Sequence, residues 1–220
     1  MTLKPPLVSI IIPIKNYKCI NNLKKDLKSQ TFKNFETIIL DSNDPVSVKR
    51  NIGVKKAKGK LIVFIDDDVQ LHPKWLEELL KNAKKDRIAM GAIMTNWHFG
   101  INKDGQSCNC IFYKSKFVQF DESFKKAAFE DKDWFYRMGG VEIVPSAVIY
   151  HMDQQRHSIR KNFIFGVEDV KMWKKYKGKE WTHSIKHSMY NNIRDSLIYL
   201  SRAFGIMWGL VKYDILKRND

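Results

Sequence analysis

Three consecutive carboxylates, Asp66, Asp67 and Asp68, directly follow the apolar run Leu61–Ile65. Adjacent carboxylates repel one another, so three of them at the end of a buried strand persist best beside a cation. Their oxygens suit hard divalent ions such as Mg²⁺ or Mn²⁺. A metal ion held there could neutralise the charge of a departing diphosphate. The alternative interpretation is a solvated acidic turn that caps the following helix.

A second acidic segment, Glu130-Asp131-Lys132-Asp133, begins a predicted helix. A carboxylate beside a metal–diphosphate site can take a proton from an acceptor hydroxyl. Helix starts also favour acidic residues for electrostatic reasons alone, so the segment by itself indicates capping as readily as catalysis. His151, after the apolar segment 148–150, is a further candidate that could complete a metal site or serve as a structural histidine.

Short apolar runs alternate with segments of helical periodicity through the first 94 residues or so. Strands are predicted at Leu7–Ile14, Phe35–Leu40, Leu61–Ile65 and Ile88–Met94, with helices between them that open after Ile14, at Asp44-Pro45 and at His72-Pro73. This alternation predicts an α/β fold with a mainly parallel central sheet and helices on both faces. Ligands of such sheets bind at the carboxyl ends of strands, so Asp41 and the Asp66 cluster should face one crevice.

Beyond Met94 the pattern is irregular, with strands predicted at Cys110–Tyr113 and Glu142–Tyr150 and a short helix at Asp131–Met138. From about residue 159 onward the chain is predicted to be helical. We therefore expect a catalytic domain over 1–158 and a helical extension over 159–220 that packs on it or contacts a membrane. The apolar run 206–211 is too short to span a bilayer, but basic residues flank it, as in helices that lie in an anionic membrane interface.

The composition, with 44% hydrophobic residues, excludes a disordered chain, and the net charge of +15 needs an explanation. Nucleic acid, an anionic membrane and phosphorylated substrates would all explain it, and so would scattered surface lysines. Three cysteines, Cys19, Cys108 and Cys110, make no disulfide framework, and the last two are too close together for the usual zinc pair, so they are expected to be small apolar residues. With no secretory signal, a cytoplasmic location is expected, at most peripheral at the cytoplasmic membrane face.

Five motifs occur in an order that resembles the inverting glycosyltransferase family 2, which has the GT-A fold. They cover roughly residues 7–151 and are the strand 8–16, the helix 49–53 with 57–59, the strand and acids 65–68, the FDESF segment 120–124 and the acids 130–133. Agreement of five ordered motifs is hard to obtain by chance. One departure from the family pattern is Ser107-Cys108-Asn109-Cys110, which stands where the family often has a glycine-rich segment. The resemblance therefore does not define the acceptor pocket.

The resemblance implies a role for each matching residue. Asp131 would be the catalytic base, and Glu130 would position that base or the acceptor. The nucleotide would lie along the main chain of Pro13 and Lys15. Asp41 would contact the nucleobase, Arg50 would lie near the nucleobase or the phosphates, and Asp66 and Asp67 would also line the nucleotide site. The metal ligands would be Asp68, most directly, then Asp66, and His151.

The function expected from these residues is metal-dependent transfer of a sugar from a nucleotide diphosphate sugar, UDP first, to a hydroxyl of a glycan or a lipid-linked acceptor. A nucleotidyltransferase is the nearest alternative, although segment 14–17 lacks the glycine of a triphosphate-binding loop. A haloacid-dehalogenase-type phosphatase fits the acidic triplet only loosely. A basic nucleic-acid-binding module remains as an alternative of another class, but no helix-turn-helix, zinc knuckle or RNP-like strand is visible, so no nucleic acid is expected.

Overall fold

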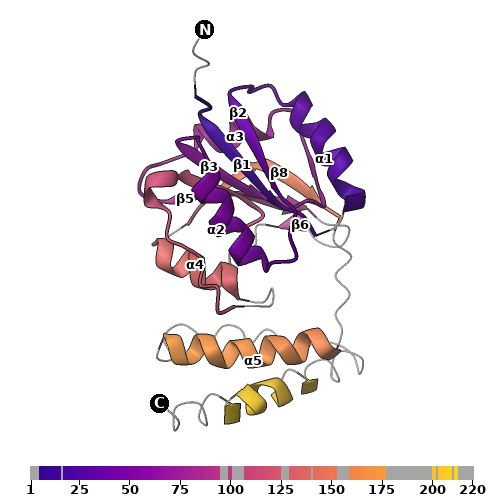
Figure 1. Cartoon of the computed structure of the whole chain (residues 1–220), viewed down its shortest axis with the longest axis vertical. Helices are drawn as coiled ribbons and strands as arrows, with labels where there is room; N and C mark the ends of the chain where they lie inside the picture. Colours follow the sequence, from indigo (N-terminus) through magenta and orange to yellow (C-terminus); the bar gives the residue numbers. More distant parts are fainter. Residues whose placement is uncertain are drawn as a thin grey trace. The chain divides into compact units, whose positions relative to one another are not determined.

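The computed structural model of the chain describes residues 5–15, 17–94, 99–100, 107–124, 129–139, 141–152, 159–176, 200–201, 203–209 and 211–212. The chain divides into two compact units, 1–153 and 154–220, and Figure 1 shows the elements of each. The boundary predicted from the sequence, between 158 and 159, adjoins residues 153–158, which lie outside the described part. The helices predicted over 177–199 also lie outside it.

The first unit is built on one sheet of eight described strands. In sequence order they are β1 (Val8–Pro13), β2 (Phe35–Leu40), β3 (Leu61–Ile65), β4 (Val69–Leu71), β5 (Ile88–Met94), β6 (Phe99–Gly100), β7 (Asn109–Tyr113) and β8 (Val141–His151). Their spatial order is β2-β1-β3-β7-β5-β8-β4, with β6 beside β5. The predicted α/β fold with a mainly parallel sheet is confirmed, because β1, β2, β3, β5 and β8 all run the same way.

Two features of the sheet go beyond the prediction. β7 lies between β3 and β5 and runs against both of them. The short strand β4 directly follows the acidic triplet and pairs antiparallel with the end of β8, where Val69 lies opposite His151. The sequence signalled a helix soon after the triplet, and three residues of strand are too few for periodicity to reveal.

Alternate residues of the central strands pack into two separate cores. Val63 and Ile65 of β3 pack with α1 (Tyr17–Ser29) and α3 (Trp75–Lys81) on one face. Ile62 and Phe64 pack with α2 (Val46–Lys56) and α4 (Glu130–Met138) on the other. The period of two along the strand thus places helices on both faces, as predicted. The second helix begins after Pro45 rather than with an Asp44 cap, since no side chain caps it among the described residues.

The strand directions decide where polar residues gather. The carboxyl ends of β1, β2, β3 and β8 lie at one edge of the sheet, which brings Lys15, Asp41, Asp66 and His151 to that edge. β7 runs the opposite way, so the residues before it, Ser107 and Cys108, arrive at the same edge. Residues from five distant parts of the sequence therefore lie at one edge of the sheet.

The second unit contains α5 (Ile159–Lys175) and a C-terminal helix described at 200–201, 203–209 and 211–212. The two helices lie side by side within this unit, as the orange and yellow helices of Figure 1. Glycines make the close contact: a Cβ at Gly205 would lie 2.1 Å from the carbonyl oxygen of Phe163, and one at Gly209 would lie 3.1 Å from Val170.

Candidate active site

Arg50, from the middle of α2, joins two of the acidic motifs. One of its Nη atoms lies 2.9 Å from Oδ1 of Asp131, and the other lies 3.0 Å from Oδ1 of Asp66. The guanidinium carbon also lies 5.6 Å from the ring centres of both Phe64 and Phe120. Burial by itself would lower the pKa of Arg50, but the carboxylates of Asp131 and Asp66 raise it above its ordinary value, so the side chain is a fixed cation.

The third nitrogen of the guanidinium, Nε, differs from the two Nη atoms. The buried Nε of Arg50 has no hydrogen-bond partner among the described residues. A buried donor without a partner is costly, and such a donor at a candidate site is one that an anionic ligand could satisfy.

Asp131, in the first turn of α4, is held from two sides. Besides Arg50, it accepts hydrogen bonds from the hydroxyl of Ser107 and, at 3.2 Å, from the backbone N–H of Ser107. Its side chain remains 25% exposed, so an incoming hydroxyl group could reach it. The carboxylate is thus fixed in direction and open to solvent, which a general base requires.

The three acids after β3 do not all point the same way. Asp66 and Asp68 both face His151, whose Nε2 lies 3.9 Å from Oδ2 of Asp66 and 3.4 Å from Oδ1 of Asp68. Asp67 instead is 2% exposed and accepts the backbone N–H of Lys15 at 2.8 Å. In this structure Asp67 ties the end of β1 to the acidic turn, and its role as a nucleotide contact stays a prediction.

The pKa values at the acidic turn follow from this arrangement. Burial alone would raise the pKa of Asp66, but the hydrogen bond from His151 and the charge of Arg50 hold it below its ordinary value. Burial raises the pKa of Asp68, and the neighbouring charges of Asp66 and Asp67 raise it further, against the opposing effect of His151. The like charges of Asp66 and Asp67 thus add to the effect of burial on Asp68, and a divalent cation would offset both.

Cys108 is a site residue that the sequence did not reveal. One ligand atom each of Asp66, Cys108 and His151 lies within 4.8 Å of the others, so the thiol joins the potential metal ligands. Burial, then the charges of Asp66 and Asp131, raise the pKa of this thiol well above its ordinary value. The spacing to Cys110 had suggested two small apolar residues on one side of a strand, but Cys108 lies in the turn before β7, and only Cys110 is part of the strand.

Two further residues of α2 hold the site together. Lys49 is buried and its Nζ donates to the carbonyl oxygen of Ile14 at 2.6 Å, which fixes the end of β1. Asn51 exchanges hydrogen bonds of 2.8 and 3.0 Å with the backbone of Phe120 and donates to Glu122 at 2.8 Å. The motif around Arg50 thus positions both the nucleotide-side strand and the FDESF segment.

For the remaining predicted residues, the structure gives the position in the fold and the burial. Pro13 is buried at the end of β1, and Asp41 is exposed directly after β2. Lys15 is exposed beyond β1, and Glu130 is buried, 6% exposed, at the start of α4. The individual roles of these four residues stay predictions. Asp133 and Arg137 pair within α4, with N–O distances of 2.6 and 2.9 Å.

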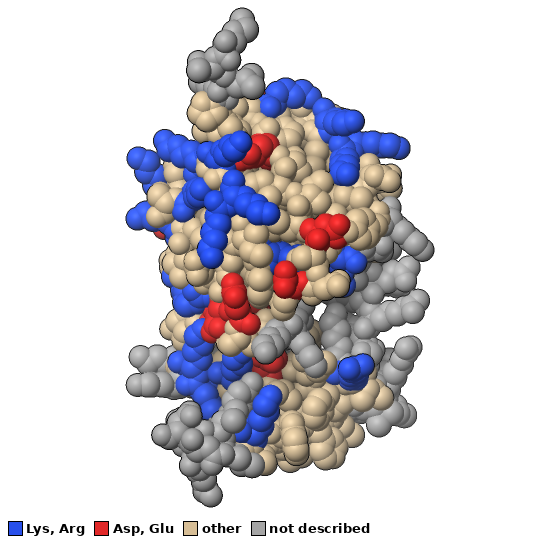
Figure 2. Space-filling model, in the orientation of Figure 1, with Lys and Arg blue, Asp and Glu red and all other residues tan. Residues whose placement is uncertain are grey.

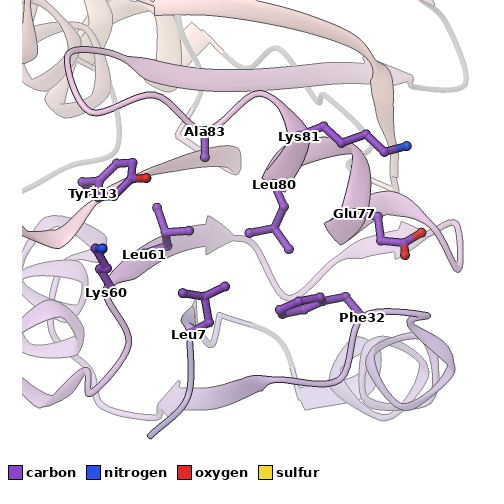
Figure 3. A pocket seen from close by; sticks show the side chains of 9 residues that line it. All are labelled: Leu7, Phe32, Lys60, Leu61, Glu77, Leu80, Lys81, Ala83 and Tyr113. Atoms are coloured by element: carbon purple, nitrogen blue, oxygen red, sulfur yellow. The ribbon is translucent and has the colours of Figure 1, made fainter.

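An apolar pocket of about 460 Å³ lies elsewhere, at the other edge of the sheet. Figure 3 shows Leu7, Leu61 and Tyr113 lining it, together with Phe32 and Leu80. Leu7 and Leu61 stand at the beginnings of β1 and β3, whereas the acidic residues follow strand ends. This pocket contains none of the predicted site residues and is separate from the candidate active site.

The order of the strands and the acidic edge define a GT-A-type nucleotide-binding fold. Solved structures of S. aureus TarS have this fold. Residues 1–349 of TarS in complex with UDP-GlcNAc match with a TM-score of 0.58 at 13% identity, over 89% of this chain and 79% of that one. The same part of TarS in complex with UDP matches with a TM-score of 0.55 at 13% identity, over 97% of this chain and 92% of that one.

Sequence comparisons give two matches to glycosyltransferases. Residues 43–127 match the model described as glycosyl transferase family 2. The Bacillus subtilis (strain 168) protein EpsH, whose name describes it as a glycosyltransferase, is 23% identical over 199 residues, which cover 73% of this chain. These matches support the resemblance to glycosyltransferase family 2, which the family model covers over residues 43–127. It spans only 57% of the length of EpsH and 47% of the longer TarS chain.

Proposed function

We propose that the unit 1–153 transfers a sugar from a nucleotide diphosphate sugar, with UDP as the nucleotide, to an acceptor hydroxyl with inversion at the anomeric carbon. The observation that carries the proposal is Arg50, which joins Asp66 of the metal-side motif to Asp131 of the acceptor-side motif. The bound UDP and UDP-GlcNAc of the TarS structures support the choice of nucleotide. We infer a glycan or lipid-linked acceptor and a cytoplasmic location from the sequence alone.

The chain's own residues would divide the work in the following way. Asp131 takes the proton of the acceptor hydroxyl as its oxygen bonds to the anomeric carbon from the face opposite the nucleotide. The bond from that carbon to the diphosphate oxygen breaks, and its electron pair leaves with the diphosphate. The hydrogen bonds from Arg50 and Ser107 keep the carboxylate of Asp131 aimed while this happens.

The donor atoms at the acidic edge fit a divalent cation. Asp66 and Asp68 offer two carboxylates, which suit Mn²⁺ and Mg²⁺, and His151 adds an imidazole. Cys108 lies beside them, but its thiol would bind a metal ion only as the thiolate, which its raised pKa disfavours. When bound, such an ion would neutralise negative charge on the diphosphate. Arg50 would add a fixed positive charge nearby, and its unpaired Nε is a donor that a phosphate oxygen could accept from.

A thermal-shift panel tests the proposal directly. UDP, GDP and dTDP are each added to the full chain with and without Mn²⁺. A ligand at one hundred times its Kd stabilises the folded state by about 2.7 kcal/mol, which should raise the Tm by about 5–10 °C for UDP with Mn²⁺. Asp68→Ala should abolish the part of the shift that needs Mn²⁺, whereas the exposed Asp86→Ala, at the opposite end of the sheet, should keep it.

Direct assay of product completes the test. Hydrolysis or transfer from a UDP-sugar with Mn²⁺ supports the proposal. Absence of a shift with all three nucleotides, in a protein with a normal unfolding transition, would refute it. Binding that ignores nucleotides but falls steeply with salt on an oligonucleotide would instead favour the nucleic-acid-binding alternative.

A further inference from the structure

The C-terminal helix of the second unit exposes its large apolar residues. Leu200, Phe204, Met207, Trp208 and Val211 are 51–58% exposed. Their spacing of three and four residues places all five on one face of the helix. Five large side chains in a continuous stripe form an apolar patch of the kind that marks an interaction site in soluble proteins.

The small residues of the same helix face α5 instead. Ser201 is 8% exposed, and Gly205 and Gly209 lie against Phe163, Val167 and Val170 of α5. A helix that packs in a core usually buries its largest apolar residues, and this one buries its smallest. The packing between the two helices is therefore satisfied without the apolar stripe, which is left for another partner.

Charge identifies that partner. Segment 154–220 contains fourteen Lys and Arg against six Asp and Glu, so it carries +8 of the chain's net charge of +15 in less than a third of its length. Between residues 196 and 213 the charged residues are Arg202 and Lys212, without an acid. Lys and Arg side chains likewise outweigh acidic ones on the face shown in Figure 2. An apolar stripe with a Trp and cationic surroundings fits an anionic bilayer better than a protein surface of mixed charge.

We propose that the C-terminal helix docks on the surface of an anionic membrane, with Leu200, Phe204, Met207, Trp208 and Val211 in the interface. None of the described helices is long and apolar enough to cross a bilayer, so the contact is with one leaflet. The acyl-chain boundary receives the apolar stripe, and the anionic headgroups attract the basic residues around it. This inference does not depend on the proposed glycosyl transfer.

Vesicle sedimentation with the full chain tests the proposal. Vesicles of phosphatidylcholine with phosphatidylglycerol should pellet the protein at low salt, and vesicles of phosphatidylcholine alone should pellet less of it. The double substitution Phe204→Ser with Trp208→Ser should weaken binding by about tenfold or more, because each side chain contributes apolar area to the interface. Val118→Ser, an exposed apolar position in the first unit, is the matched control and should bind normally.

A second measurement does not rely on a disruptive variant. Brominated acyl chains should quench part of the tryptophan fluorescence of the wild-type chain, and Trp208→Phe should remove that quenching while the protein still sediments with vesicles. If the wild-type chain fails to bind anionic vesicles at low salt, the proposal is wrong. Equal binding by the double variant would mean that another surface docks. A chain that self-associates through this stripe, and becomes monomeric in the double variant without any vesicle binding, would show that a second copy covers it.

Discussion

At the scale of single residues, Arg50 holds the candidate site in place. It is 3% exposed in its side chain and contacts carboxylates of two segments that lie 65 residues apart, Asp66 and Asp131. Each carboxylate lowers the cost of burying the guanidinium, and the guanidinium keeps the two carboxylates from repelling each other. The site therefore depends on three charges at once. Loss of the central charge, Arg50, should lower both the stability of the fold and the activity of the site.

Arg50→Ala should lower the free energy of unfolding by about 3–5 kcal/mol, because two partly buried carboxylates lose their shared partner. Urea unfolding followed by circular dichroism measures this loss. The control is Arg87→Ala, since Arg87 is 46% exposed and pairs, among the described residues, with exposed or partly exposed acids, so its loss should have a much smaller effect. Similar losses in the two variants would contradict the central role of Arg50.

Asp131→Asn should reduce transfer by about a hundredfold to ten-thousandfold while donor binding stays nearly the same. The amide keeps the shape of the side chain but cannot accept the proton. Turnover and the UDP thermal shift are compared for the wild type, Asp131→Asn and Asp86→Asn. Near-normal turnover in Asp131→Asn would mean that Asp131 is only a helix-terminal acid and that the base lies elsewhere.

At the scale of elements, a hydrogen-bonded turn fixes how α2 leads into β3. Glu36 of β2 accepts from the hydroxyl of Ser9 and from the backbone N–H of Lys58, both at 2.6 Å, and Ser9 in turn accepts from Gly59 at 2.8 Å. A Cβ at Gly59 would lie 2.6 Å from the backbone nitrogen of Ser9, so only glycine fits this approach. The turn sets the register of β3 beside β1, and so decides where Asp66 emerges.

Glu36→Gln tests the turn through its pH dependence. Burial by itself would raise the pKa of Glu36, but the hydrogen bonds from the hydroxyl of Ser9 and the backbone N–H of Lys58 hold it below its ordinary value of 4.5. The folded chain then binds this proton less readily than the unfolded chain, so the stabilisation is present above about pH 4.5 and is lost as the pH falls through the folded pKa.

The expected difference in unfolding free energy between wild type and Glu36→Gln is about 1–3 kcal/mol at pH 7, and it should shrink below pH 4. Denaturant unfolding at several pH values measures it. Glu77→Gln, at a half-buried position of α3, serves as the control and should show a much smaller difference. A constant difference from pH 7 to pH 3 would show that the carboxylate charge of Glu36 plays no part.

At the scale of the whole molecule, the chain has one unit with the candidate active site and one helical unit. Every residue of the candidate active site lies within 1–153, and the helix pair with the apolar stripe lies within 154–220. Each unit has its own internal packing, which is a sheet between two cores in the first and two helices joined through glycines in the second. A substitution inside one unit should therefore be separable from the function of the other.

Gly205→Leu should disrupt the helix pair, because a side chain at this position would overlap the backbone of Phe163. Limited proteolysis should cut segment 154–220 faster in this variant, while the thermal shift with UDP and Mn²⁺ stays as in the wild type. Ala203→Leu adds the same side chain at an exposed position of the same helix and should leave the proteolysis rate unchanged. Loss of the UDP shift in Gly205→Leu alone would show that the two units depend on one another.

The sequence by itself indicated most of the element types and several of the residues that gather at the acidic edge. Its apolar segments predicted β1, β2, β3, β5, β7 and β8 within a residue or two. The signal is clearest for β1, β3 and β5, because strands buried on both faces leave uninterrupted apolar segments. The resemblance of its motifs to family 2 proved sound for residues 43–127. It also picked out Asp66, Asp131 and Arg50, which the fold brings into contact.

Only the tertiary structure decided how these parts meet. β7 runs against its neighbours, and this reversal brings Ser107 and Cys108 to the acidic edge, which no local pattern encodes. Asp67 turns inward to Lys15 while its neighbours face His151, because one residue of a turn can point away from the next. Periodicity and motifs report on neighbours along the chain, whereas strand direction, pairing and the contacts of a turn depend on segments far apart in sequence.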